Sequence, residues 1–249
     1  MSIISNFIDT KHGRLAYKAF KGDPDKPGVL FLGGFASSMA GTKASFLLDR
    51  GVQVGQSTVV FDYMGHGDSD GRFQDGTISI WLQNALDVLD NLTEGPQIVV
   101  GSSMGGWLML LLAVARPKRV CRMVGLASAP GFTEDMWHYR LEEADREKMK
   151  AEGVIEKVMG EDTYQLSYAL IQDGRKFLLE DLINYRCPLF LVHGVADLVV
   201  PWSVSAGLLA KARAPMVNLT LVKDGDHRLN RPEDLALLEK LICPDPLLP

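Results

Sequence analysis

Two stretches of the chain match the pattern Gly-x-Ser-x-Gly, which carries the nucleophilic serine in many hydrolases. They lie at Gly101–Gly105 (GSSMG) and at Gly67–Gly71 (GDSDG). With 24 glycines among 249 residues, the pattern is expected by chance about 0.15 times in a chain of this length. The pattern alone therefore identifies neither serine as catalytic, and the neighbouring sequence has to discriminate between them.

Ser103 stands between a strand pattern and a helix pattern. A short apolar run, Ile98–Val100, precedes it, and an uninterrupted apolar stretch, Met104–Ala115, follows it. A tight turn from strand to helix exposes the serine hydroxyl and leaves the next backbone N–H available to an oxyanion. Gly101 and Gly105 permit the close backbone packing that such a turn requires. We predict that Ser103 is the nucleophile.

The second serine, Ser69, has a different setting. It lies between Asp68 and Asp70 in a glycine-rich turn, with no helix pattern directly after it. Negative charge on both sides would oppose an oxyanion that develops there. Serine, aspartate and glycine all favour turns. We predict that Ser69 is a structural turn residue.

A serine hydroxyl needs a base with a pKa near neutrality, and histidine is the usual one. Serine hydrolases built on parallel sheets have the chain order serine, acid, histidine, with the histidine after the last strand. Among five histidines, His227 meets this requirement, because it follows the strand pattern Val217–Val222. The others, which do not meet it, are His12, His66, His138 and His193.

The acid that orients the histidine should follow a strand at its carboxyl end, where the catalytic loops of such sheets collect. Asp197 follows the strand pattern Pro188–Val192 and is our first choice. Glu134 or Asp135, after the preceding strand, is the alternative. Two further carboxylates are too near His227 in sequence to be first choices and are expected at most to modulate its pKa, namely Asp224 and Asp226.

The turn after the strand pattern Val29–Leu32 is expected to supply the rest of an oxyanion hole. We predict that the backbone N–H groups of Phe35 and Met104 form it; the alternative is a glycine turn that only reverses the chain. Gly34 is a candidate for the substrate pocket. Trp107, one helical turn after Ser103, is a second candidate, with core packing as an equal alternative.

Strand and helix patterns alternate along the chain, which predicts an α/β fold with a mostly parallel central sheet flanked by helices. Strands are predicted at 28–32, 58–62, 98–100, 120–127, 188–192 and 217–222, and helices at 77–92, 104–115 and 233–242. We predict one domain over residues 1–249. The charged, helical stretch without a strand pattern at about 131–185 is too long for a plain connection. It is predicted to be a helical cap over one end of the sheet.

Composition excludes several classes of function. The net charge of −5 and the scattered basic residues argue against nucleic-acid binding. The longest apolar run, Trp107–Ala115, is about half of the roughly 20 residues needed to span a bilayer. The cysteines Cys121, Cys187 and Cys243 have no paired spacing and indicate a reducing compartment. We expect no metal and no cofactor.

Four stretches together resemble one known family. They are Gly95–Leu110 (GPQIVVGSSMGGWLML), Phe61–Gly71 (FDYMGHGDSDG), His193–Trp202 (HGVADLVVPW) and Asp226–Leu229 (DHRL). They are similar to the α/β-hydrolase domain-containing protein 10 group, over most of the chain and most weakly from about 131 to 180. The resemblance implies an α/β-hydrolase fold, with esterase and acyl-protein thioesterase chemistry, and a triad at Ser103, Asp197 and His227.

These observations predict a serine hydrolase that cleaves carboxylic ester or acyl thioester bonds of small-molecule or protein-linked substrates through an acyl-enzyme. The alternatives are an acyltransferase or perhydrolase with the same triad, and a non-catalytic binding protein on this fold. Animal members of the group are organelle proteins with a targeting extension. The start of this sequence has no such pattern, and we expect a cytoplasmic protein.

Overall fold

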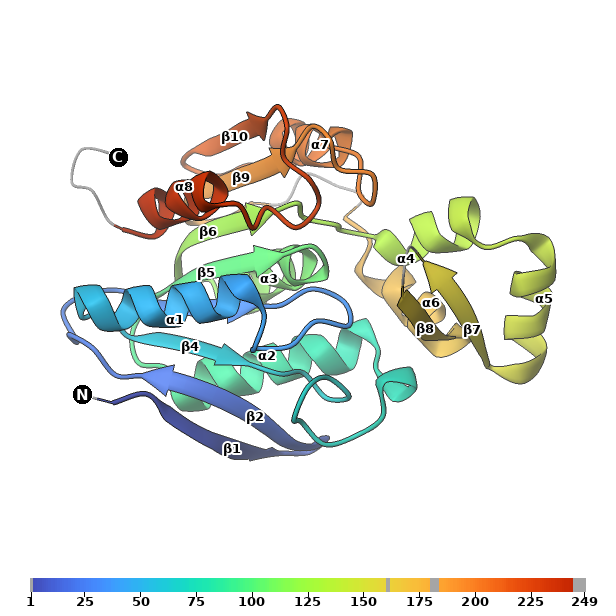
Figure 1. Cartoon of the computed structure of the whole chain (residues 1–249), viewed down its shortest axis with the longest axis horizontal. Helices are drawn as coiled ribbons and strands as arrows, with labels where there is room; N and C mark the ends of the chain where they lie inside the picture. Colours follow the sequence, from blue (N-terminus) through green and yellow to red (C-terminus); the bar gives the residue numbers. More distant parts are fainter. Residues whose placement is uncertain (1, 160–161, 180–183, 244–249) are drawn as a thin grey trace.

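The computed structural model describes residues 2–159, 162–179 and 184–243. Eight strands form one sheet in the order β1-β2-β4-β3-β5-β6-β9-β10 (Figure 1). Their bounds are β1 Ile4–Thr10, β2 Gly13–Phe20, β3 Gly28–Leu32, β4 Thr58–Phe61, β5 Gln97–Ser102, β6 Val120–Leu126, β9 Leu189–Gly194 and β10 Val217–Val222. β1 and β2 pair antiparallel, as do β2 and β4, whereas β4, β3, β5, β6, β9 and β10 run parallel.

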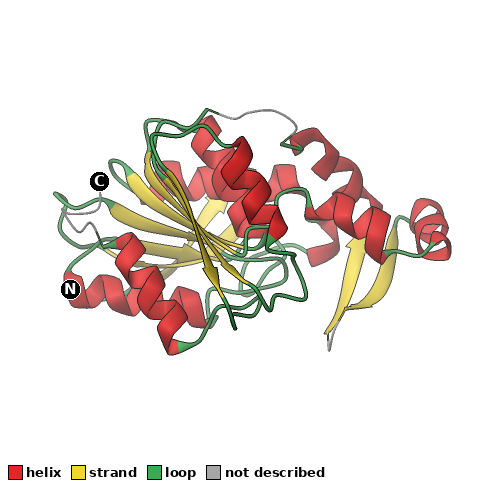
Figure 2. Ribbon diagram, turned by 90° about the horizontal axis from the view of Figure 1, so that it is seen from above, coloured by secondary structure: helices red, strands yellow, loops and turns green. Residues whose placement is uncertain are grey.

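Helices cover both faces of the sheet (Figure 2). α1 (Thr42–Val54) and α8 (Pro232–Ile242) bury apolar side chains against one face. α2 (Ile78–Leu92), α3 (Met104–Ala115) and α7 (Ser203–Lys211) pack against the other. Every residue of β3, β5 and β9 is buried, because helices cover both of their faces. The continuous apolar runs of the sequence therefore form the central parallel strands.

The ends of the helices follow from local sequence. α2 begins after Thr77, whose hydroxyl accepts a hydrogen bond from the Ile80 N–H. α1 ends at Gly55, which adopts a left-handed conformation with a φ of 65°. α8 begins with Pro232, which needs no partner for a missing N–H at a first helical position. A short 3-10 turn, η1 (Phe73–Asp75), precedes α2.

An insertion between β6 and β9 lies beside one end of the sheet (Figure 1). It contains α4 (Phe132–Asp135), a π-helical turn η2 (Met136–Arg140), α5 (Glu143–Glu152), β7 (Val154–Met159), β8 (Asp162–Ser167), α6 (Tyr168–Gly174) and a 3-10 turn η3 (Arg175–Phe177). Trp137, Met149, Ile155 and Leu166 are buried in a small core of its own. Hydrogen bonds from Ser79 to Asp173 fasten it to α2. We propose that it is the cap of a single domain.

The antiparallel pair β7–β8 is a difference from the prediction of helices alone in this stretch. Ile155 pairs with Leu166, and both are buried, while most other described side chains of the pair are at least partly exposed. A hairpin with one such small buried face produces no continuous apolar run, so the sequence shows no clear strand pattern. Among the described residues, no helix has the length and apolar character needed to cross a membrane.

Candidate active site

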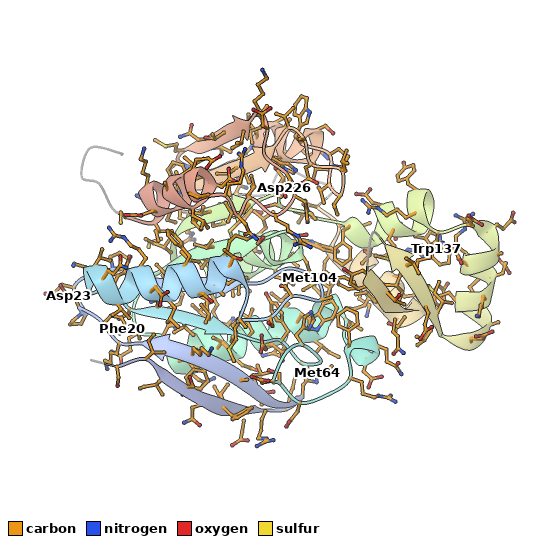
Figure 3. All side chains as sticks on the ribbon, in the orientation of Figure 1. Phe20, Asp23, Met64, Met104, Trp137 and Asp226 are labelled. Atoms are coloured by element: carbon orange, nitrogen blue, oxygen red, sulfur yellow. The ribbon has the colours of Figure 1, made fainter. Side chains whose placement is uncertain are left out.

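The loops that follow β3, β4, β5, β9 and β10 meet at the carboxyl ends of these strands, which is where parallel α/β sheets bind ligands. Figure 3 shows Met64 and Asp226, from the loops after β4 and β10, and Met104, the first residue of the helix after β5, at the end of the sheet that faces the insertion. Ser103, Asp197 and His227 all belong to this set of loops.

Ser103 joins β5 directly to α3 in a backbone conformation that is rare outside glycine, with φ 54° and ψ −118°. Its own backbone is held on both sides. The Ser103 N–H donates to the Leu126 carbonyl at 2.9 Å, and its carbonyl accepts from Gly106 at 2.9 Å and Ala129 at 3.0 Å. The surrounding hydrogen bonds therefore maintain a strained turn that exposes the side chain.

The two glycines of this motif have no room for a side chain. A Cβ at Gly105 would lie 2.0 Å from the Leu32 carbonyl oxygen, and one at Gly101 would lie 2.3 Å from the Gly105 carbonyl oxygen. The helix can begin beside the end of β3 only because these positions lack a side chain. The close approach of these backbones is therefore the physical reason for both glycines in the Gly-x-Ser-x-Gly pattern at this position.

The predicted base and acid lie in hydrogen-bond reach of the serine. His227 Nε2 is 3.1 Å from Ser103 Oγ, and His227 Nδ1 is 2.8 Å from Asp197 Oδ2. A carboxylate can only accept, so Nδ1 carries the proton in the neutral ring and Nε2 is left to accept the serine proton. The geometry suits removal of a proton from Ser103.

Asp197 has a buried side chain that accepts several hydrogen bonds. The N–H groups of Val199 and Val200 each donate to Oδ1 at 2.8 Å. Burial raises the pKa of this carboxyl, but the hydrogen bonds from His193, His227 and Val200 outweigh burial and hold its pKa well below its ordinary value. Asp197 is therefore a carboxylate at neutral pH and can orient His227.

His193 is a second partner of this acid, to which the sequence analysis gave no role. Its side chain is fully buried, and Nε2 lies 2.9 Å from the Val200 carbonyl and 3.2 Å from Asp197 Oδ2. Both are acceptors, so Nε2 carries a proton, and Nδ1 lies 2.7 Å from Ser205 Oγ. The four-residue spacing of a histidine and an aspartate at a strand end was the only signal for this contact.

The predicted oxyanion hole is open to an acceptor. Among the described residues, the N–H groups of Phe35 and Met104 have no hydrogen-bond acceptor, and Met104 is the first residue of α3, where helix N–H groups lack partners. A Cβ at Gly34 would lie 3.4 Å from Ser103 Cβ, so this turn passes directly beside the serine. Two free donors beside the serine can hold an oxyanion.

Phe35 is anchored by a cluster of aromatic rings. Its ring centroid lies 4.8 Å from Phe73, 6.0 Å from Trp81, 5.4 Å from Phe132 and 5.7 Å from Tyr164. The first two partners belong to the main body and the last two to the insertion. The insertion therefore helps to fix the turn whose backbone faces Ser103.

His66 fixes the same turn from the other side. Its Nε2 accepts a hydrogen bond from the Ala36 N–H at 3.1 Å, and Ala36 has an unfavourable φ of 55°. Burial lowers the pKa of His66 to about 4, so the ring is neutral and able to accept. The sequence analysis excluded His66 as the base and found no other role for it. Its contact with Ala36, thirty residues earlier, is a tertiary one.

A cavity of about 410 Å³ opens beside Ser103, and Gly34, Phe35 and His227 are among its lining residues. Trp107 is not among them. It is fully buried, donates its indole N–H to the Phe177 carbonyl at 3.2 Å, and so helps to attach the insertion. This placement corresponds to the alternative of core packing.

The alternative acids lie away from the cavity, and Glu134 has other partners. Glu134 pairs with Arg175 at 2.8 Å and with His138 at 3.2 Å. Neither Glu134 nor Asp135 lines the cavity. Within the described ranges, no group of three or more His, Cys, Asp or Glu side chains is arranged to hold a metal ion.

Comparison with known proteins identifies the family. The model of the alpha/beta hydrolase family matches residues 29–237. The palmitoyl-protein thioesterase ABHD10, mitochondrial, of Mus musculus is 37% identical over 227 residues, which cover 90% of this chain and 76% of that protein. Its Homo sapiens counterpart is 36% identical over 228 residues, 90% of this chain and 74% of that protein.

Solved structures agree. A crystal structure of a putative hydrolase from Agrobacterium vitis S4 matches with a TM-score of 0.91 and 35% identity, over 98% of this chain and 100% of that one. The structure of alpha/beta hydrolase domain-containing protein 10 from mouse matches with a TM-score of 0.86 and 34% identity, over 94% of this chain and 95% of that one. The predicted fold class is therefore confirmed.

The relatives also correct one expectation. The ABHD10 proteins are described as mitochondrial, which points away from the cytoplasmic location expected from the sequence. The cytoplasmic prediction is wrong because unpaired cysteines indicate a reducing compartment without saying which one. The confirmed fold and the named thioesterase relatives support an esterase or thioesterase rather than a binding protein. The chain belongs to the alpha/beta hydrolase family and is similar, over most of its length, to the ABHD10 group within it.

Proposed function

We propose that this protein is a serine hydrolase that cleaves acyl thioester or carboxylic ester bonds through an acyl-enzyme at Ser103. The observation that carries the proposal is the unbroken line of contacts from Ser103 Oγ to His227 and from His227 to a buried Asp197 carboxylate. This arrangement makes a serine hydroxyl nucleophilic at neutral pH without any further group.

Each step has a residue to perform it. Ser103 Oγ attacks the acyl carbon while its proton moves to His227 Nε2, and the carbonyl oxygen becomes an oxyanion held by the N–H groups of Phe35 and Met104. The oxyanion then collapses, the bond to the leaving group breaks, and His227 returns the proton to the leaving sulfur or oxygen. Water, with His227 again as base, releases the acid and restores Ser103.

The thioester is the first bond to test, because the curated relatives are named palmitoyl-protein thioesterases. A thiol leaves readily, so the reaction makes its main demand on activation of the nucleophile and on the oxyanion hole. The contact of Ser103 Oγ with His227 Nε2, and the Phe35 and Met104 N–H groups without an acceptor among the described residues, support both requirements.

The test combines labelling with turnover. A fluorophosphonate should modify Ser103, shown by mass spectrometry of the labelled peptide, and the labelled enzyme should be inactive. Matched thioesters and oxygen esters of one fatty acid should yield the free acid and the thiol or alcohol. Labelling elsewhere, or turnover that survives labelling, would refute the assignment. Acyl transfer to an added alcohol in place of acid release would instead indicate an acyltransferase.

A further inference from the structure

One wall of the cavity beside Ser103 carries positive charge. Lys43, from the first turn of α1, and Arg228, from the loop after β10, both line it together with Asn230. Lys43 Nζ donates to the Arg228 carbonyl and, at 3.0 Å, to Asn230 Oδ1. The lysine is therefore held in position although it lies far from Arg228 in the sequence.

Neither cation has a carboxylate partner among the described residues, where no ion pair within 4.0 Å involves Lys43 or Arg228. Lys43 is half-buried, and both of its hydrogen-bond acceptors are neutral. The cavity is also lined by Gly41, Thr42 and Ala44, where α1 begins without a side-chain cap. The positive end of the helix dipole adds to the same field. A partly buried ammonium with no carboxylate in direct contact favours an anion that arrives with a ligand.

The charged wall lies on the side of the base. Arg228 and Asn230 follow His227 by one and three residues, and His227 is the group that returns a proton to the departing sulfur or oxygen. We propose, on the basis of the proposed function, that Lys43 and Arg228 form a subsite for a carboxylate or phosphate carried by the leaving group of the substrate. Small thiols and alcohols that bear such an anion are then the preferred leaving groups.

The charge of Lys43 makes the subsite sensitive to pH. Burial, together with the positive charge of Arg228, lowers the pKa of Lys43 to about 8, although the carboxylates of Asp226 and Asp234 act in the opposite direction. The folded pKa lies below the usual lysine value, so the ammonium is lost as the pH rises through about 8. Arg228 keeps its charge throughout that range.

The experiment uses two thioesters that differ by one carboxylate. The same medium-chain acyl group is attached to N-acetylcysteine, which carries a carboxylate, and to N-acetylcysteamine, which does not. A second pair, acyl-4′-phosphopantetheine and acyl-pantetheine, differs by one phosphate. The ratio of kcat/KM within each pair is measured for the wild type, Lys43→Met, Arg228→Gln and the control Lys118→Met, whose side chain is exposed beyond the opposite end of α3.

We expect the wild type to favour the anionic member of at least one pair by about tenfold, as a charge-assisted contact would give. Lys43→Met and Arg228→Gln should each lower that ratio several-fold, and Lys118→Met should keep it. In Arg228→Gln the remaining preference should decline as the pH rises above about 8 and Lys43 loses its proton, at a higher pH than in the wild type because Arg228 no longer lowers the pKa of Lys43. The pair that shows the preference identifies the anion as carboxylate or phosphate.

The outcomes separate this inference from the function on which it rests. Equal kcat/KM values for both members of both pairs in the wild type would overturn the subsite while leaving the thioesterase intact. A preference that survives in Lys43→Met and in Arg228→Gln would overturn it as well. If Lys43→Met does not fold, Arg228→Gln and the pH series decide. Absence of turnover on all four thioesters and on the matched oxygen esters would refute the proposed function and this inference together.

Discussion

Two turns of this protein share the pattern Gly-x-Ser-x-Gly, and they use it differently. Ser103 has a backbone with positive φ and a side chain that faces His227. Ser69 accepts a hydrogen bond from the Ala16 N–H at 2.9 Å and donates to the Asp62 carbonyl at 2.7 Å. The first hydroxyl is presented to a base, whereas the second ties a loop to two neighbouring strands.

The glycines of the two turns also differ in purpose. Gly105 lets α3 begin against the end of β3, whereas Gly67 leaves room for the Asp62 carboxylate, which would lie 2.0 Å from a Cβ there. That carboxylate accepts from the N–H groups of Met39 and Asp68. The turn at 62–71 therefore has a structural role, and its residue His66 accepts a hydrogen bond from Ala36 in the turn that carries Phe35. The same local pattern thus carries the proposed nucleophile in one place and helps to position the neighbouring turn in another.

The largest expected contrast is between the two serines. Ser103→Ala should abolish fluorophosphonate labelling and lower kcat by several orders of magnitude, about 10⁶ in a well-studied serine protease. Ser69→Ala should keep labelling and turnover but lose about 1–2 kcal/mol of stability for two hydrogen bonds. Labelling, kcat and thermal unfolding of both variants check this. Activity that survives in Ser103→Ala and vanishes in a folded Ser69→Ala would reverse the assignment.

The next contrast is between the two carboxylates. Asp197→Asn should lower kcat by about 10²–10⁴, because an amide can donate to His227 Nδ1 and favour the wrong tautomer. Asp62→Asn should act mainly on stability, since Asp62 is not in contact with His227. The measurement is kcat of each variant beside Glu134→Gln, which should remain active. A loss confined to Glu134→Gln would move the acid to the loop after β6.

Variants of His66 should have a smaller effect on kcat and should distinguish a positioning role from a catalytic one. His66→Leu removes the acceptor of the Ala36 N–H, a part-buried hydrogen bond that is worth about 1 kcal/mol, and loosens the turn at Phe35. We expect kcat to fall about tenfold with little change in KM. His66→Gln, whose amide oxygen can accept, should recover part of the loss, and His12→Gln should match the wild type. Equal loss in the leucine and glutamine variants would contradict a positioning role.

The smallest effect concerns stability at acid pH. Because the pKa of His66 is lowered from 6.5 to about 4 in the folded protein, the unfolded chain binds a proton between these values that the native state does not. The free energy of unfolding should therefore fall as the pH decreases from 6.5 to about 4, by up to about 3 kcal/mol.

Denaturant unfolding at several pH values tests this. His66→Leu should show a weaker decline over the same range, while Ser103→Ala should follow the wild type. An unchanged slope in His66→Leu would show that other groups account for the acid sensitivity.

Much of this protein could be predicted from its sequence. The continuous apolar runs predicted β3, β4, β5, β6, β9 and β10, and each lies within a few residues of its expected range. The same holds for α2, α3 and α8. Ser103 was predicted from the strand and helix patterns on either side of it, and Asp197 and His227 from their order along the chain. The structure brings these three side chains together.

Other elements required the tertiary structure. β1 and β2 were not predicted. β1 lies at the edge of the sheet and is largely exposed, so its apolar pattern is weak. α1, α7 and the hairpin β7–β8 were missed as well. The positions of these elements depend on which surfaces of the central sheet remain to be covered. Their own sequences give little indication of those surfaces.

The partners of the site show the same division. His66 beside Ala36, and Lys43 beside Arg228, are contacts across 30 and 185 residues. Local sequence specifies a turn or a strand because neighbouring residues share one backbone. Such long-range contacts exist only after the parallel strands have aligned their carboxyl ends. The sequence by itself determined which residues are predicted as nucleophile, base and acid, namely Ser103, His227 and Asp197; the packing of the sheet decided what surrounds them.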